Sequence, residues 1–201
     1  MNAIILAGGK NSRIGTRKAL LEIDGKQILA RIIETLKPLF AEIILVTNEP
    51  EVYQSFGLPM VQDEICGEGP LGGIHAGLGA SQATYSFVVA CDMPFLDRRI
   101  VEYVQDQVRS LNGATPACIV PRWEKGIEPL HAFYHRDLRT LIPAEVAQGQ
   151  RKLGYLVRKW GTTFVDLDQW AAENGVDLLK AFSNVNTWAE FEQAQNNSGK
   201  K

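Results

Sequence analysis

The segment after the first apolar run holds the residue types that are best suited to chemistry. Between residues 8 and 18 it combines three glycines with four cations: Gly8, Gly9, Lys10, Arg13, Gly15, Arg17 and Lys18. Glycines let the backbone bend and bring its N–H groups close to an anion, whose charge nearby cations neutralise. The segment therefore predicts a phosphate-holding loop in which Arg13 and Lys18 neutralise charge. The alternative is a solvated basic turn at the end of a core strand.

This loop differs from the two common nucleotide-binding motifs. In a P-loop, four residues separate two glycines, and Lys and Ser or Thr follow at once. Here five residues separate Gly9 from Gly15, and Lys18 comes three residues after Gly15. Lys10 stands where the dinucleotide fingerprint GxGxxG has its second glycine. A nicotinamide-dependent dehydrogenase is therefore disfavoured.

Asp92 ends a continuous apolar run that predicts a strand buried on both faces. A carboxylate in that position is costly unless it is paired, hydrogen-bonded or bound to a metal. Mg²⁺ on a nucleotide takes one or two carboxylates together with phosphate oxygens and waters. We therefore predict that Asp92 is a catalytic residue and a ligand of Mg²⁺ or Mn²⁺. The alternative is a residue that only closes the turn before Pro94.

Two more polar residues, Asn48 and Asp63, also come at the ends of predicted strands. Ligands of parallel sheets bind outside the carboxyl ends of the strands, so these residues should meet the loop and Asp92 at one edge. Their side chains can hydrogen-bond a ribose or a base, and simple turn residues are the alternative. We predict a nucleoside between Leu6 and Asp63, with Ala7 at the strand end and Gly73 allowing close backbone approach.

Apolar periodicity predicts alternating strands and helices. The expected strands are 2–7, 43–46, 60–61, 87–91, 117–120, 128–134 and 163–165, and the expected helices are 28–36, 51–56, 71–79, 100–111, 138–146, 153–160 and 187–195. Thr187 and Glu190 form a capping box for the last helix. The alternation predicts an α/β, three-layer Rossmann-like fold: helices cover both faces of a mostly parallel sheet, with 128–134 as its antiparallel edge.

Composition sets the broad class of the protein. The chain has 201 residues, of which 45% are hydrophobic, and a net charge of −2. This suits a single domain, which we place at 1–195, with a frayed tail at 196–201. The nearly balanced charge gives no field that would attract nucleic acid, and every apolar run is shorter than the ~20 residues of a membrane span. Three cysteines without a CxxC pair or a secretory signal favour the cytoplasm.

Five ordered motifs resemble the molybdenum cofactor guanylyltransferases among the nucleotidyltransferases. They are the run from Leu6-Ala7-Gly8-Gly9 to Lys18-Ala19-Leu20-Leu21, then Gly69-Pro70-Leu71-Gly72-Gly73-Ile74, Ala90-Cys91-Asp92-Met93-Pro94, Pro129-Leu130-His131-Ala132 and Asn184-Val185-Asn186. Ile14 replaces the usual Met, which is a volume-conserving exchange. The resemblance implies Mg-dependent transfer of GMP from GTP to molybdopterin with release of pyrophosphate. It also implies molybdenum-insertion proteins and molybdoenzyme chaperones as partners.

The resemblance further implies roles for individual residues. Backbone N–H groups from Gly8 to Gly15 would hold the leaving phosphates with Arg13, Lys18 would steady the α-phosphate, and Asp92 would hold the metal. Residues 1–112 would form the nucleotide-binding half, and residues 113–195 the acceptor-binding half. The candidates for contact with molybdopterin are Arg151, Lys152, Asn184, Asn186 and, if it is not structural, His131.

Two other functions stay open at this point. A related nucleotidyltransferase of the same fold would move CMP or act on a sugar or polyol phosphate, and only the resemblance favours GTP. A non-catalytic nucleotide-binding adaptor in cofactor maturation is the second alternative. The presence of both Lys18 and Asp92 argues against such an adaptor.

Overall fold

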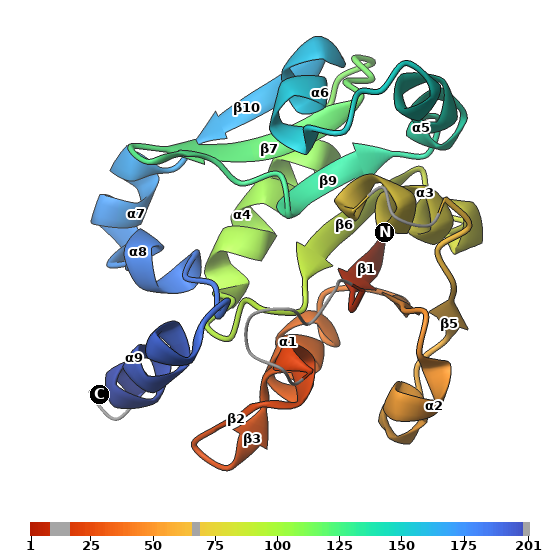
Figure 1. Ribbon diagram of the computed structural model, residues 1–201. Coiled ribbons are helices and arrows are strands. Elements are labelled where there is room, and N and C mark those ends of the chain that lie inside the picture. Colours follow the sequence, from red (N-terminus) through yellow and green to blue (C-terminus); the bar gives the residue numbers. More distant parts are fainter. Residues whose placement is uncertain (9–16, 66–68, 199–201) are drawn as a thin grey trace.

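An eight-stranded mixed sheet forms the middle layer of the computed structural model, which describes residues 1–8, 17–65 and 69–198 (Figure 1). The strands are β1 (Asn2–Leu6), β4 (Ile43–Val46), β5 (Met60–Val61), β6 (Tyr85–Ala90), β7 (Cys118–Trp123), β8 (Gly126–Ile127), β9 (His131–His135) and β10 (Thr162–Asp166), with a separate hairpin of β2 (Glu22–Ile23) and β3 (Lys26–Gln27). The helices are α1 (Ile28–Leu36), α2 (Pro50–Tyr53), α3 (Pro70–Ala80), α4 (Arg98–Arg109), α5 (Leu138–Ala147), α6 (Leu153–Lys159), α7 (Asp168–Asn174), α8 (Leu178–Ala181) and α9 (Trp188–Ser198), with short 3₁₀ turns at Lys18–Leu20 and Gln54–Phe56.

The sheet order is β10-β7-β9-β6-β1-β4-β5, and β8 pairs with β7 outside this row. The pairs β6–β1, β1–β4, β4–β5 and β10–β7 are parallel. Only β9 and the short β8 run against their neighbours in the described sheet. The carboxyl ends of β1, β4 and β6 consequently open on the same edge, as the alternation of strands and helices predicts.

Alternate residues of β1 enter two hydrophobic cores. Ala3 and Ile5 pack with α1 and α4 on one face, whereas Ile4 and Leu6 pack with α3, α5 and α6 on the other. This alternation follows from the two-residue period of a strand whose two faces are both covered. The three-layer α/β architecture is therefore confirmed.

The predicted place of the antiparallel strand is wrong. We expected segment 128–134 at the edge of the sheet, but β9 pairs with β6 on one side and β7 on the other. Ala132, Phe133 and Tyr134 are fully buried, because both faces and both backbone edges of β9 are covered. A strand that reverses direction inside a sheet leaves no local signal of its position, since pairing partners lie far away in sequence.

The C-terminal part differs from expectation in two further ways. The helices α7 and α8 were not predicted, and α9 extends to Ser198 instead of fraying from residue 196. Figure 1 shows α7, α8 and α9, in blue, running in succession towards the sheet edge where β1 and β6 end. Within the described ranges, no helix is long and apolar enough to cross a membrane.

Candidate functional site

A cleft of about 990 Å³ opens at the carboxyl ends of β1, β4 and β6. Its lining includes ten predicted site residues: Leu6, Ala7, Gly8, Lys18, Asn48, Asp63, Gly73, Asp92, Asn184 and Asn186. These residues come from both ends of the chain, so the fold assembles the site from distant segments. Three predicted loop residues, Gly9, Arg13 and Gly15, lie outside the described residues.

The floor of the cleft is an extension of the sheet. The Ala7 N–H donates to the Val46 carbonyl at 2.9 Å, and the Cys91 N–H donates to the Leu6 carbonyl at 3.1 Å. The first turn of α3 lies directly against this floor, since a Cβ atom on Gly73 would be 3.1 Å from Cδ2 of Leu6. A side chain at position 73 would therefore require the end of the Leu6 side chain to shift by a few tenths of an ångström.

Lys18 and Asp92 meet within the cleft. The Lys18 ammonium lies 3.6 Å from Oδ2 of Asp92, and the two side chains are only 22% and 21% exposed. The same ammonium donates to Oδ1 of Asn186 at 2.6 Å. The Val185 N–H donates to the Asp92 carbonyl at 2.9 Å, which fixes the segment carrying Asn186 against the end of β6.

The environment of Asp92 suits a cation bound together with phosphate. Burial raises the pKa of Asp92, and the positive charge of Lys18 opposes that rise. No group of three or more His, Cys, Asp or Glu residues in the described chain could form a complete metal cage. The donor set therefore fits a hard cation such as Mg²⁺, which keeps several waters and takes other ligands from substrate phosphates.

Asn48 and Asp63 shape one wall of the cleft. The Asp63 N–H donates to Oδ1 of Asn48 at 3.0 Å, and Oδ1 of Asp63 accepts from the Ile65 N–H at 2.9 Å. A Cβ atom on Gly72 would overlap the Asp63 carboxylate, so only glycine lets α3 approach it. The side chains of Asn48 and Asp63 consequently line the cleft and also accept hydrogen bonds from the backbone after β5.

Comparison with known proteins agrees with this architecture. Residues 3–164 match the family model described as "MobA-like NTP transferase domain". The chain belongs to this family.

Full-length relatives carry names consistent with that membership. A "Probable molybdenum cofactor guanylyltransferase" from Peptoclostridium acidaminophilum is 36% identical over 195 residues, which cover 96% of this chain and 87% of the relative. A "Molybdenum cofactor guanylyltransferase" from Syntrophotalea carbinolica is 37% identical over 192 residues, covering 96% and 89%. The crystal structure of "Molybdopterin-guanine dinucleotide biosynthesis protein A" from Archaeoglobus fulgidus superposes with a TM-score of 0.82 at 22% identity, covering all of both chains.

Three residues predicted to contact the acceptor do not line the cleft of this MobA-like chain. Arg151 and Lys152 are exposed before α6, and they are not part of the cleft lining. His131 is fully buried, with its ring 5.0 Å from that of Phe87 and 5.2 Å from that of Phe182. Burial lowers the pKa of His131 to about 4, so the imidazole is neutral near pH 7. The burial and the ring contacts therefore support the structural role for His131.

Two acidic cleft residues of the MobA-like fold were missed. Glu128 accepts from Nε1 of Trp123 at 2.8 Å, and burial raises the pKa of its carboxyl. Glu49 forms an ion pair with Arg17 at 2.7 Å, which lowers the pKa of Glu49. The sequence signal for Glu128 was available, since a carboxylate before Pro129 interrupts an otherwise apolar segment. Arg17, one of the four cations of the predicted phosphate loop, is therefore paired with Glu49.

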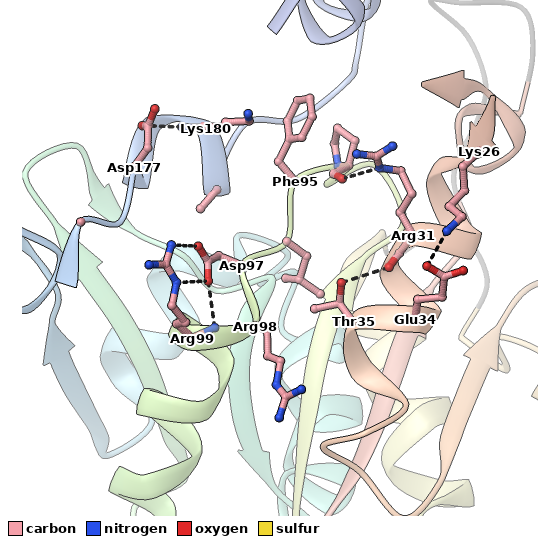
Figure 2. A pocket seen from close by; sticks show the side chains of 14 residues that line it. Lys26, Arg31, Glu34, Thr35, Phe95, Asp97, Arg98, Arg99, Asp177 and Lys180 are labelled. Carbon is pink, nitrogen blue, oxygen red and sulfur yellow. Dashed lines mark hydrogen bonds and ion pairs between the residues drawn. The ribbon is translucent and has the colours of Figure 1, made fainter. Parts of the chain in front are cut away.

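A second, polar pocket of about 660 Å³ lies beside the cleft (Figure 2). Its cations are Lys26, Arg31, Arg98, Arg99 and Lys180. Figure 2 shows that most of these side chains are joined to neighbouring groups, such as Lys26 to Glu34 at 2.6 Å and Arg99 to Asp97 at 2.7 Å. Lys26 thus joins the hairpin to α1, Arg31 joins α1 to the Pro94 carbonyl, and Arg99 joins the start of α4 to the Asn174 carbonyl at the end of α7.

Proposed function

We propose that this MobA-like NTP transferase moves GMP from GTP to the terminal phosphate of molybdopterin and releases pyrophosphate. The observation that carries the proposal is the Lys18 ammonium 3.6 Å from the Asp92 carboxylate inside a cleft at the strand ends. The names of the full-length relatives support the choice of GTP and molybdopterin.

The reaction needs alignment and charge neutralisation more than proton transfer. The molybdopterin phosphate is already an anion, so its oxygen can attack the α-phosphorus of GTP without a general base. As the bond from the pterin phosphate oxygen to the α-phosphorus forms, the bond from the α-phosphorus to the oxygen that bridges the α- and β-phosphates breaks. Pyrophosphate leaves with that electron pair. Lys18 stabilises the charge that develops on the α-phosphate, and holding both phosphates in line supplies much of the acceleration.

Asp92 would hold Mg²⁺ or Mn²⁺ against the triphosphate. When bound, the cation supplies positive charge to phosphate oxygens in a place where solvent is partly excluded. Backbone N–H groups from Gly8 to Gly15 and the Arg13 guanidinium are the proposed partners of the leaving phosphates. Among the described residues, the charged groups that line the cleft are Lys18, Asp92 and the acidic side chains of its wall.

The two substrates occupy different parts of the cleft in this proposal. Leu6, Asn48, Asp63 and Gly73 line the side assigned to guanosine. Asn184 and Asn186 line the side assigned to the acceptor, and the contact of Asn186 with Lys18 supports a position for Asn186 between the two substrates. Arg151 stays a prediction for the acceptor, as do the molybdenum-insertion proteins and molybdoenzyme chaperones as partners.

A turnover assay with purified protein tests the proposal. Molybdopterin and Mg²⁺ or Mn²⁺ are combined with each of the four nucleoside triphosphates in turn, and both pyrophosphate and guanylylated pterin are measured. We expect both products with GTP and a divalent cation, and neither with EDTA. Preferential release with CTP would replace the guanylyl assignment with a cytidylyl one. Binding of GTP without turnover would favour the adaptor and overturn the proposal.

A further inference from the structure

The N-terminus of α9 makes one hydrogen bond more than a capping box requires. Thr187 and Glu190 form the box: the Glu190 N–H donates to Oγ1 of Thr187 at 3.2 Å, and the Thr187 N–H donates to Oε2 of Glu190 at 2.9 Å. The same Oε2 also accepts from the Asn186 N–H at 2.6 Å. Glu190 therefore fixes the residue before the cap as well as the helix itself.

That additional bond acts on the residue that contacts Lys18. Asn186 accepts from the Lys18 ammonium at 2.6 Å across 168 positions of sequence. The Lys18 side chain has four rotatable bonds and carries a large rotamer entropy, so its position depends on a fixed partner. The neighbouring Val185 N–H donates to the Asp92 carbonyl. The segment 184–186 is thus held at Val185 by Asp92 and at Asn186 by Glu190.

We propose that Glu190 is a positioning residue, which holds Asn186 so that Asn186 holds the Lys18 ammonium beside Asp92. The inference deepens the proposed guanylyl transfer and rests on it. Glu190 touches neither substrate in this scheme. It acts through the segment 184–186, and its charge in addition raises the pKa of Asp92, an effect that Glu190→Gln removes while keeping an acceptor oxygen. Because misplacing a reacting group by about 1 Å can cost about 100-fold in rate, loss of this support should lower kcat.

The matched pair of variants is Glu190→Ala and Thr187→Ala. Both weaken the cap of α9, but only Glu190→Ala releases the Asn186 N–H, because Thr187→Ala leaves Oε2 of Glu190 in place. We expect Glu190→Ala to lower kcat by about tenfold to 100-fold, with a much smaller change in KM for GTP. Thr187→Ala should have a similar effect on Tm and little effect on kcat. Glu190→Gln keeps an acceptor oxygen and should restore most of the rate.

A double mutant tests whether Glu190 acts through Asn186. In an Asn186→Ala background, Glu190→Ala should lower kcat little further, because the partner that it positions has already been removed. Equal losses of kcat in Glu190→Ala and Thr187→Ala, or fully multiplicative losses in the double mutant, would overturn the inference. If Glu190→Ala does not fold, Glu190→Asp keeps the charge, shortens the reach and has the same two outcomes.

Failure of this inference is distinguishable from failure of the proposed function. Wild-type protein that transfers no nucleotide overturns the function, whatever the variants do. In that case the separation of Lys18 and Asp92 in crystals of Glu190→Ala still tests the positioning. An unchanged separation would overturn it, and a displaced Lys18 side chain would support it.

Discussion

The cleft and the second pocket share one loop, but their charged side chains have different partners. Asp92 and Met93 line the cleft, and the next residues, from Pro94 to Asp97, line the second pocket. In the second pocket Arg99 makes two hydrogen bonds to the Asp97 carboxylate and a third to the Asn174 carbonyl. In the cleft the Lys18 ammonium stands 3.6 Å from the Asp92 carboxylate and bonds to a neutral amide.

The difference separates charges that stabilise the fold from the charges that we propose to bind the triphosphate and its cation. The guanidinium of Arg99 is half exposed and already matched, so its pair with Asp97 adds about 1 kcal/mol or less. Lys18 and Asp92 are mostly buried, and their charges interact through less water. A triphosphate with its cation can engage both groups at once, which is why the larger effects on activity are expected in the cleft.

The largest effect is expected from Asp92→Asn, which removes the cleft carboxylate and keeps its shape. We expect guanylyl transfer to fall by about 1,000-fold, because the proposed cation loses its protein ligand. Tm should not fall, for two reasons. The backbone carbonyl of residue 92 still accepts from the Val185 N–H, and the variant no longer buries the Asp92 carboxylate charge. The control in the second pocket is Asp97→Asn, which retains a good helix cap and should leave kcat unchanged. Substantial transfer by Asp92→Asn would remove the metal-binding role.

His131 lies between the two regions. Its neighbour in sequence, Leu130, lines the cleft, and its ring contacts Phe182, which follows Ala181 of the second pocket in sequence. Its folded pKa of about 4 lies below the ordinary value of 6.5, so the unfolded chain binds more protons between these pH values. The free energy of unfolding should therefore fall as pH drops from about 6.5 to about 4, by up to about 3 kcal/mol from this group.

Urea denaturation of wild type and His131→Leu over that pH range measures the His131 contribution. The variant should lack this part of the pH dependence, so its stability relative to wild type should rise as the pH falls towards 4. Parallel stability curves would show that the buried imidazole does not set the acid sensitivity.

Lys18→Ala is expected to have the next largest effect. It removes the charge proposed to act on the α-phosphate, and kcat should fall by about 100-fold, or about 2.7 kcal/mol. The matched lysine of the second pocket is Lys26, which forms an exposed ion pair with Glu34 and lies outside the cleft lining. Lys26→Ala should leave pyrophosphate release unchanged, and comparable losses in both variants would mean that the two regions are not functionally distinct.

The smallest effect is expected in the second pocket. Asp97 caps α4 by accepting from the Arg99 N–H at 2.8 Å, so Asp97→Ala should cost about 1 kcal/mol of stability. Arg98→Ala, which breaks an exposed pair with Glu102, should cost less than about 0.5 kcal/mol. Chemical denaturation gives both values, and turnover should be unchanged in each. A large loss of kcat in Asp97→Ala would instead tie the pocket to catalysis.

Much of the site was predictable because strand ends carry local signals. Continuous apolar runs located β1, β4 and β6, and the rule for parallel sheets then placed the loop and Asp92 at one edge. The role of Asn186 was not predictable in the same way. Its type suggested a substrate contact, whereas its observed partner is Lys18. Likewise, the sequence around His131 could not show that the rings of Phe87 and Phe182 pack against its imidazole.

By itself, the sequence determined the alternation of strands and helices and the strand-end position of Asp92. These features depend on side-chain periodicity and chain direction, which are local properties. Only the tertiary structure decided that β9 lies inside the sheet and that Asn186 contacts Lys18. Such contacts join segments far apart in sequence, and they depend on which backbone edges and side-chain oxygens remain available after the local elements have packed.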